Sequence, residues 1–70
     1  MATDEDKLRM LLPHWIEHNA EHAAEFRQWA EKARSAARED VAEDVDLAAT
    51  ELGWVNEALT SALHKLNSAV

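Results

Sequence analysis

Three histidines spaced four residues apart are the side chains most able to do chemistry in this sequence. They are His14, His18 and His22. Residues four apart adjoin on one face of a helix, so their imidazoles are expected to lie side by side, with Glu21 and Glu25 along the same side. Imidazole and carboxylate ligands together suit a divalent transition metal such as zinc, nickel, copper or iron. The spacing therefore predicts a metal site built from these five residues.

The tryptophan beside this row indicates how deeply the histidines are buried. If Trp15 marks the centre of the buried face, His22 lies nearly on that face. His18 then lies on its shoulder and His14 at its edge, because each four-residue step turns about 40° around the helix axis. One helix supplies only two or three ligands, so a closed site needs more. A two-fold dimer would bring a second His18 and His22 within reach, whereas His64 lies on the opposite side of its own helix.

Residues 18–22 also match a protease signature, because they read H-N-A-E-H and fit the pattern H-x-x-E-H. A metalloprotease of that kind needs a third ligand on another element and a substrate cleft. A chain of 70 residues leaves little room for either. We therefore expect no enzyme, and a metal-dependent hydrolase is only a remote alternative.

A structural role for the same histidines is the main alternative to metal binding. A histidine on an apolar face often packs and forms hydrogen bonds, and a buried polar residue can fix helix register and partner choice. The chain is then a homodimerisation or protein-interaction domain in which core histidines set the register. A pH-sensing role is a third possibility, because imidazole changes charge near neutral pH.

The elements that position these residues are predicted to be two long helices. Helix-forming residues dominate, and a single glycine and a single proline leave little to interrupt them. We predict one domain over residues 1–70, an all-α antiparallel hairpin with helices at about 4–36 and 41–68. Thr3 is the expected N-cap of the first helix, and Asp40 with Glu43 forms an expected capping box for the second.

Each helix carries an apolar stripe whose members alternate four and three residues apart, the pattern of a helix buried on one side. In the first helix the stripe consists of Leu8, Leu12, Trp15, Asn19, His22, Phe26, Trp29, Ala33 and Ala36. In the second helix it consists of Val41, Val45, Ala48, Leu52, Val55, Leu59, Ala62, Leu66 and Ala69.

Two residues are unusual within these helices. Pro13 removes a backbone hydrogen bond, so the first helix is either kinked there or begins anew at that residue. The stripe keeps its phase across Pro13, which favours the kink. Gly53 lies inside the second stripe, and we expect a close helix crossing at this position.

Apolar residues outside the two stripes predict a partner. They are Leu47 and Trp54 on the second helix and a band of smaller residues, including Ile16, Ala23 and Ala30, on the first. Exposed large apolar groups at helical spacing usually indicate an interface. We predict a homodimer in which two hairpins form a four-helix bundle through these five residues.

Charge and composition exclude several other partners. The chain has 14 acidic against 7 basic side chains, a net charge of −7 and no cysteine. Such a balance disfavours nucleic acid and anionic membranes, and the lack of cysteine excludes disulfides and thiolate metal sites. With no apolar run long enough to cross a bilayer and no basic leader, we expect a cytoplasmic protein.

The histidine segment also carries a family resemblance. Residues 14–22, which read H-W-I-E-H-N-A-E-H, are followed by Phe26, Trp29 and Ala30, and residues 56–59 of the second helix read N-E-A-L. This combination resembles a small bacterial and archaeal domain of unknown function, a histidine-containing helical hairpin found in proteins linked to metal handling. The resemblance covers nearly the whole chain. It implies a hairpin and favours metal binding by His14, His18 and His22, but it implies no catalytic residue.

Overall fold

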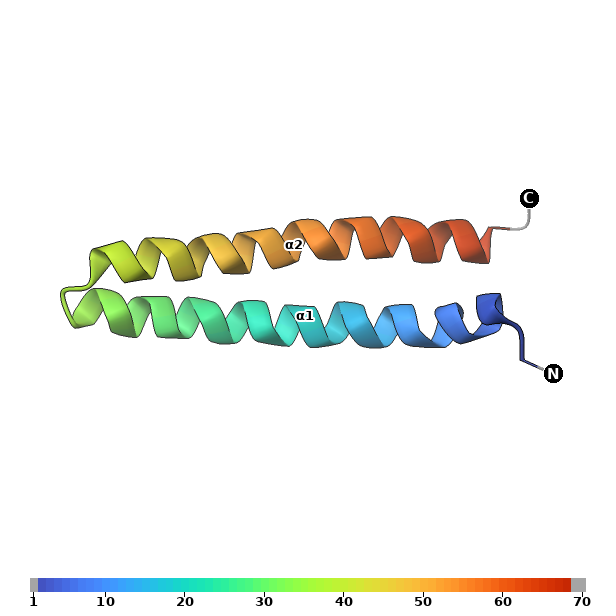
Figure 1. The fold of residues 1–70 in the computed structure, drawn as a ribbon, viewed down its shortest axis with the longest axis horizontal. Helices are drawn as coiled ribbons and strands as arrows, with labels where there is room; N and C mark the ends of the chain where they lie inside the picture. The colour runs from blue at the N-terminus through green and yellow to red at the C-terminus, as the bar shows by residue number, and fades with distance from the viewer. Residues whose placement is uncertain (1, 69–70) are drawn as a thin grey trace.

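The protein is a hairpin of two long helices. A computed structural model describes residues 2–68 and contains α1, Asp4–Ser35, and α2, Glu39–Asn67. The helices run antiparallel and side by side, and the start of α1 and the end of α2 lie at the same end of the hairpin (Figure 1). The Cα atoms extend over 54 × 20 × 12 Å. The predicted all-α hairpin is confirmed, and residues 2–68 contain no strand.

The first helix begins at the predicted N-cap. The Thr3 hydroxyl accepts a hydrogen bond from the Asp6 amide at 3.1 Å, and the Asp6 carboxylate accepts one from the Thr3 amide at 3.2 Å. These reciprocal bonds form a capping box. The bond from the Thr3 amide to the Asp6 carboxylate also holds the pKa of Asp6 below its usual value, because it stabilises the ionised form.

The turn between the helices is closed by backbone hydrogen bonds. The Arg38 amide donates to the Ala33 carbonyl at 2.9 Å, and the Ala37 amide donates to the Arg34 carbonyl at 3.0 Å. This pair of bonds is a Schellman motif, which needs a left-handed residue after the helix cap. Ala37 takes that conformation, with φ at 61°, although glycine would adopt it with less strain.

The second helix starts two residues earlier than predicted. Its N-cap is Arg38, whose side chain makes no capping hydrogen bond, and Glu39 is already helical. The predicted capping box at Asp40 is therefore wrong. The Asp40 carboxylate lies in the first helical turn and accepts hydrogen bonds from Arg38 at 3.2 Å.

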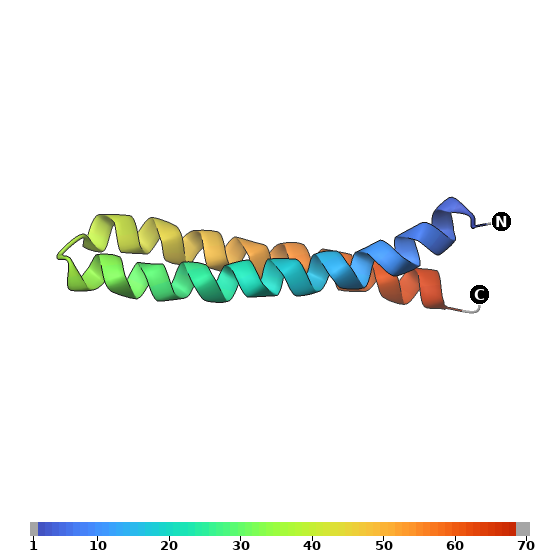
Figure 2. The ribbon, with the colours of Figure 1, turned by 90° about the horizontal axis from the view of Figure 1, so that it is seen from below.

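Buried and half-buried side chains recur on both helices at positions that alternate three and four apart. On α1 these are Arg9, Leu12, Ile16, Asn19, Ala23, Phe26, Ala30 and Ala33; on α2 they are Ala42, Val45, Ala49, Leu52, Asn56, Leu59, Leu63 and Leu66. This spacing is typical of helices that wrap around each other. Figure 2 shows this wrapping: α2 lies above α1 near the turn and below it where α1 begins and α2 ends.

Part of each predicted stripe is exposed rather than buried between the helices. Trp15 is 40% exposed and Trp29 is 57% exposed, and the neighbouring residues Ile16 and Ala30 face α2 instead. The stripe on α2 is rotated in the same direction. Alanine is fully or almost fully buried at positions 30, 42 and 49, which allows the helices to approach closely. An indole at such a position would hold them apart, so the tryptophans lie beside the contact.

The two unusual residues also behave differently from expectation. Helix α1 continues through Pro13, so a new helix starting at that residue is wrong, while the predicted kink stays a prediction. A Cβ atom added to Gly53 would meet nothing within 4 Å. The predicted close crossing at Gly53 is therefore wrong, because this residue is exposed. Ala69 of the second stripe lies outside the described residues.

Candidate functional site

Four aromatic rings form a ladder along one side of α1. Centroids of successive rings are 6.1 Å apart between His14 and His18, 4.5 Å between His18 and His22, and 6.0 Å between His22 and Phe26. The closest contact joins the Nε2 atoms of His18 and His22 at 2.7 Å. The predicted side-by-side arrangement of the histidines is therefore confirmed.

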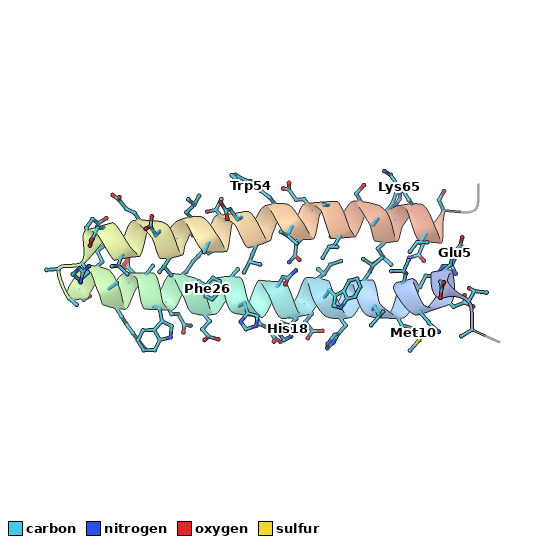
Figure 3. The ribbon with its side chains drawn as sticks, in the orientation of Figure 1. Glu5, Met10, His18, Phe26, Trp54 and Lys65 are labelled. Carbon is cyan, nitrogen blue, oxygen red and sulfur yellow. The ribbon has the colours of Figure 1, made fainter. Side chains whose placement is uncertain are left out.

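The histidines are nevertheless exposed, and His18 points away from α2 (Figure 3). The expected burial of His22 on the core face is wrong, because that expectation took Trp15 as the centre of the face. Within one hairpin the histidines therefore lie outside the core, and a role in setting helix register stays a prediction. His64 is also exposed, on α2.

The pair of Nε2 atoms presents two nitrogen donors at nearly the separation that a metal ion requires. Bonds of about 2.0–2.1 Å at a tetrahedral centre place two nitrogens about 3.3 Å apart. The observed 2.7 Å needs only small side-chain rotations to reach that value. A hollow beside the pair is lined by His14, Glu17, His18 and Glu21.

The predicted five-residue metal centre is not assembled within one chain. His14 and Glu21 line the same hollow as His18, but Glu25 does not line it, and Glu17, absent from the prediction, does. Among residues 2–68, no group of three or more histidine, cysteine, aspartate or glutamate side chains is placed to hold a metal ion. The third ligand that an H-x-x-E-H hydrolase needs is thus not in place within this part of the chain.

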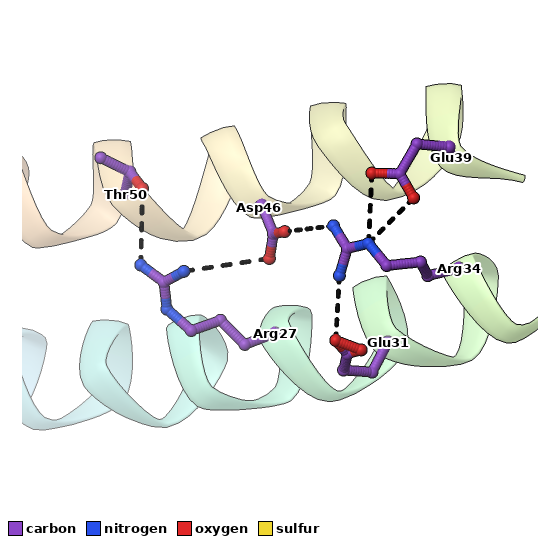
Figure 4. Close-up of polar contacts among 6 residues, drawn as sticks. All are labelled: Arg27, Glu31, Arg34, Glu39, Asp46 and Thr50. Carbon is purple, nitrogen blue, oxygen red and sulfur yellow. Dashed lines mark hydrogen bonds and ion pairs between the residues drawn. The ribbon is translucent and has the colours of Figure 1, made fainter.

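One flank of the hairpin carries a network of ion pairs that joins α1 to α2 (Figure 4). Arg34 contacts Asp46 at 2.8 Å and also Glu31 and Glu39, both at 3.0 Å. The three carboxylates, Asp46 first, raise the pKa of Arg34. Arg27 adds a longer contact with Asp46 at 3.8 Å. We call this side of the hairpin the polar flank.

A pair of asparagines crosses the helix contact. The Asn56 side chain donates to the Ile16 carbonyl at 2.9 Å and accepts from the Asn19 side chain at 3.1 Å. Asn19 lies on the predicted stripe, but sequence reasoning missed Asn56 because it placed Val55 inward. The available signal was the seven-residue spacing of Asn56 from Ala49 and Ala42.

The opposite flank exposes large apolar side chains. Their positions follow seven-residue steps, which return to the same side of a helix. We define the apolar flank as Leu8, Trp15 and Trp29 on α1 with Val41 and Val55 on α2, whose exposed fractions lie between 38% and 57%. His22, Ala48 and Ala62 occupy the intervening positions of the same two rows. One cation lies at its margin, where Lys32 Nζ is 4.1 Å from the Trp29 ring centroid.

The five residues predicted to form a dimer interface do not share a surface. Ile16 and Ala23 are half-buried and Ala30 is fully buried at the α1–α2 contact. Leu47 and Trp54 are 50% and 60% exposed, and Trp54 lies on the edge of α2 that faces away from α1 (Figure 3). The small residues do permit a close helix approach, but the helix that approaches is α2 of the same chain.

Comparisons with known proteins place the chain in a family. A family model described as Domain of unknown function (DUF8180) matches residues 8–66. This confirms the resemblance to a small domain of unknown function. Comparison with curated proteins and with solved structures gives no match. Neither helix, over the residues described, combines the length and the apolarity that crossing a membrane requires.

Proposed function

This chain belongs to the DUF8180 family, and we propose that it is a self-assembly module whose hairpins pair through their apolar flanks into a four-helix bundle. The observation that carries the proposal is the contrast between the two flanks. Arg27, Arg34 and Asp46 join the helices on one side. On the other side, Trp15 and Trp29 are exposed, and among residues 2–68 no ion pair or side-chain hydrogen bond spans the two helices beside them. Large apolar patches of this kind usually mark an interface.

The small core of the hairpin also supports the proposal. Among residues 2–68 only Leu12 and three alanines are buried. A core of this size contributes little stability to a domain of 70 residues. Burial of the apolar flank against a second copy would supply the missing apolar area.

The available area fits a second copy of the chain. The broad face of the hairpin measures 54 Å by 20 Å between Cα atoms, which is on the order of 1,000 Å² per copy against about 800 Å² per partner in a stable interface. In a two-fold dimer of identical hairpins, both partners present the same apolar rows, so the rows that meet have equal length. The cytoplasmic location and the lack of enzymatic activity expected from the sequence stay predictions.

Sedimentation equilibrium of the Trp29→Lys variant tests the proposal. We expect the dissociation constant of the dimer to rise at least about 30-fold, because a central tryptophan of an interface commonly contributes 2 kcal/mol or more. The added lysine lowers the net negative charge of each copy, which by itself would favour association. A weaker dimer therefore reports the loss of apolar contact.

The matched control is Trp54→Lys, which makes the same change on the outer edge of α2. We expect its dissociation constant to match that of the unaltered protein. If Trp54→Lys dissociates the dimer and Trp29→Lys does not, the interface is at the outer edge. If the unaltered protein is a monomer at every concentration with and without metal, self-assembly is refuted.

A further inference from the structure

We propose that two copies of the hairpin share one divalent transition-metal site at their two-fold axis, built from His18 and His22 of each copy. The inference rests on the proposed self-assembly and names the ligand that regulates it. A single chain presents two converging imidazole nitrogens, and its residues 2–68 place no group of three metal-binding side chains together. The site is therefore incomplete without the second copy.

The spacing of the apolar flank on α1 indicates where the axis lies. Trp15 and Trp29 are each seven residues from His22. If the α1 helices of two copies pack antiparallel about an axis at His22, Trp15 of one copy meets Trp29 of the other. The same axis places His22 opposite its own symmetry mate. The row is thus self-complementary, as a two-fold interface requires.

The second helix independently places the axis at the same height along the hairpin. Asn19 bonds to Asn56 and Arg27 bonds to Thr50, so α2 faces His22 somewhere between positions 50 and 56. The α2 row of the apolar flank consists of positions 41, 48, 55 and 62, and its centre lies between 48 and 55. An axis at His22 therefore passes within about one helical turn of the centre of each row.

The donor set at this axis fits a tetrahedral nitrogen site. Each copy contributes two Nε2 atoms that already lie 2.7 Å apart, and a modest opening gives the spacing of about 3.3 Å at a metal centre. Four neutral imidazoles suit zinc, copper or nickel. The cation would also offset repulsion between two copies that each carry a net charge of −7.

Metal titration with zinc chloride, followed by sedimentation velocity and calorimetry at pH 7.5, tests this site. We expect one zinc ion per two chains and a dimer dissociation constant at least about 10-fold lower than in a chelator.

Histidine variants separate this site from other zinc-binding groups. His22→Ala and His18→Ala should each abolish the zinc effect while the metal-free dimer persists, whereas His64→Ala should leave the effect unchanged. One zinc ion per chain, or a zinc effect that survives His22→Ala, would overturn the shared site. A metal-free dimer that zinc does not strengthen would overturn the shared site and leave the proposed assembly standing. A monomer under both conditions would refute both.

Discussion

The Leu12→Ala variant is expected to lose about 2–5 kcal/mol of folding stability, the usual cost of truncating a buried leucine. Leu12 is only 3% exposed, and within residues 2–68 it is the sole large side chain in the buried set. A domain of this size rarely has more than about 3–5 kcal/mol to lose. Urea denaturation followed by far-UV circular dichroism should therefore show a mainly unfolded variant at low protein concentration.

The control for this prediction is Leu47→Ala, which removes the same atoms from a side chain that is 50% exposed on α2. Its effect should stay within about 0.5 kcal/mol, as for other surface substitutions. A large loss for Leu47→Ala would mean that the outer edge of α2 is buried in solution. That result would contradict the placement of the core between the helices.

Replacement of Asn56 by alanine is expected to cost about 1–3 kcal/mol, because it leaves a half-buried donor on Asn19 without its partner. It also removes the only side-chain bond in this pair that reaches the α1 backbone, at the Ile16 carbonyl. The measurement is the free energy of unfolding from urea titration at one fixed protein concentration.

A double variant distinguishes hydrogen bonding from simple packing. Asn19→Leu with Asn56→Leu replaces both polar partners by apolar groups, so stability should return to that of the unaltered protein or exceed it. The same change should broaden the sedimentation profile, since a polar pair at a helix contact selects one register. If the stability changes of the single variants Asn19→Leu and Asn56→Leu add up to that of the double variant, the asparagine pair is not coupled.

The sequence predicts the hairpin well because local signals agree with one another. Thr3 and the acidic first turn mark the start of α1, and the lack of further glycine and proline leaves both helices long. The turn between the helices carries a weaker sequence signal than the helices themselves. Its left-handed residue is Ala37, where glycine is the usual signal, so no residue type marked the motif.

The rotation of each helix could not be predicted from the stripes alone. Positions such as 15 and 16 are both apolar, and hydrophobicity favours the larger residue, Trp15, as the inward one. The close approach of the backbones at Ala30 and Ala49 favours the opposite choice. That preference depends on which side chains α2 presents to α1. The apolar pattern of one helix gives no information about the surface of the other.

In the candidate site, too, the local features could be predicted from the sequence, whereas the features that depend on helix rotation could not. The contact between His18 and His22 follows from four-residue spacing, which is local, and was predictable. The position of Glu25 outside the hollow and of Glu17 inside it depends on side-chain directions around the helix. The apolar flank depends on the rotation of both helices, which the two stripes alone do not determine.

The distance between spin labels in the two copies most directly tests assembly about an axis at His22. The chain has no cysteine, so single variants such as Glu21→Cys and Met10→Cys can each be labelled at one exposed position. An antiparallel α1 pair centred on His22 adds about 3 Å of separation for each residue away from the axis. The account predicts a short distance from position 21 and one longer by about 30 Å from position 10. Equal distances at the two positions, or a shorter one at position 10, would contradict it.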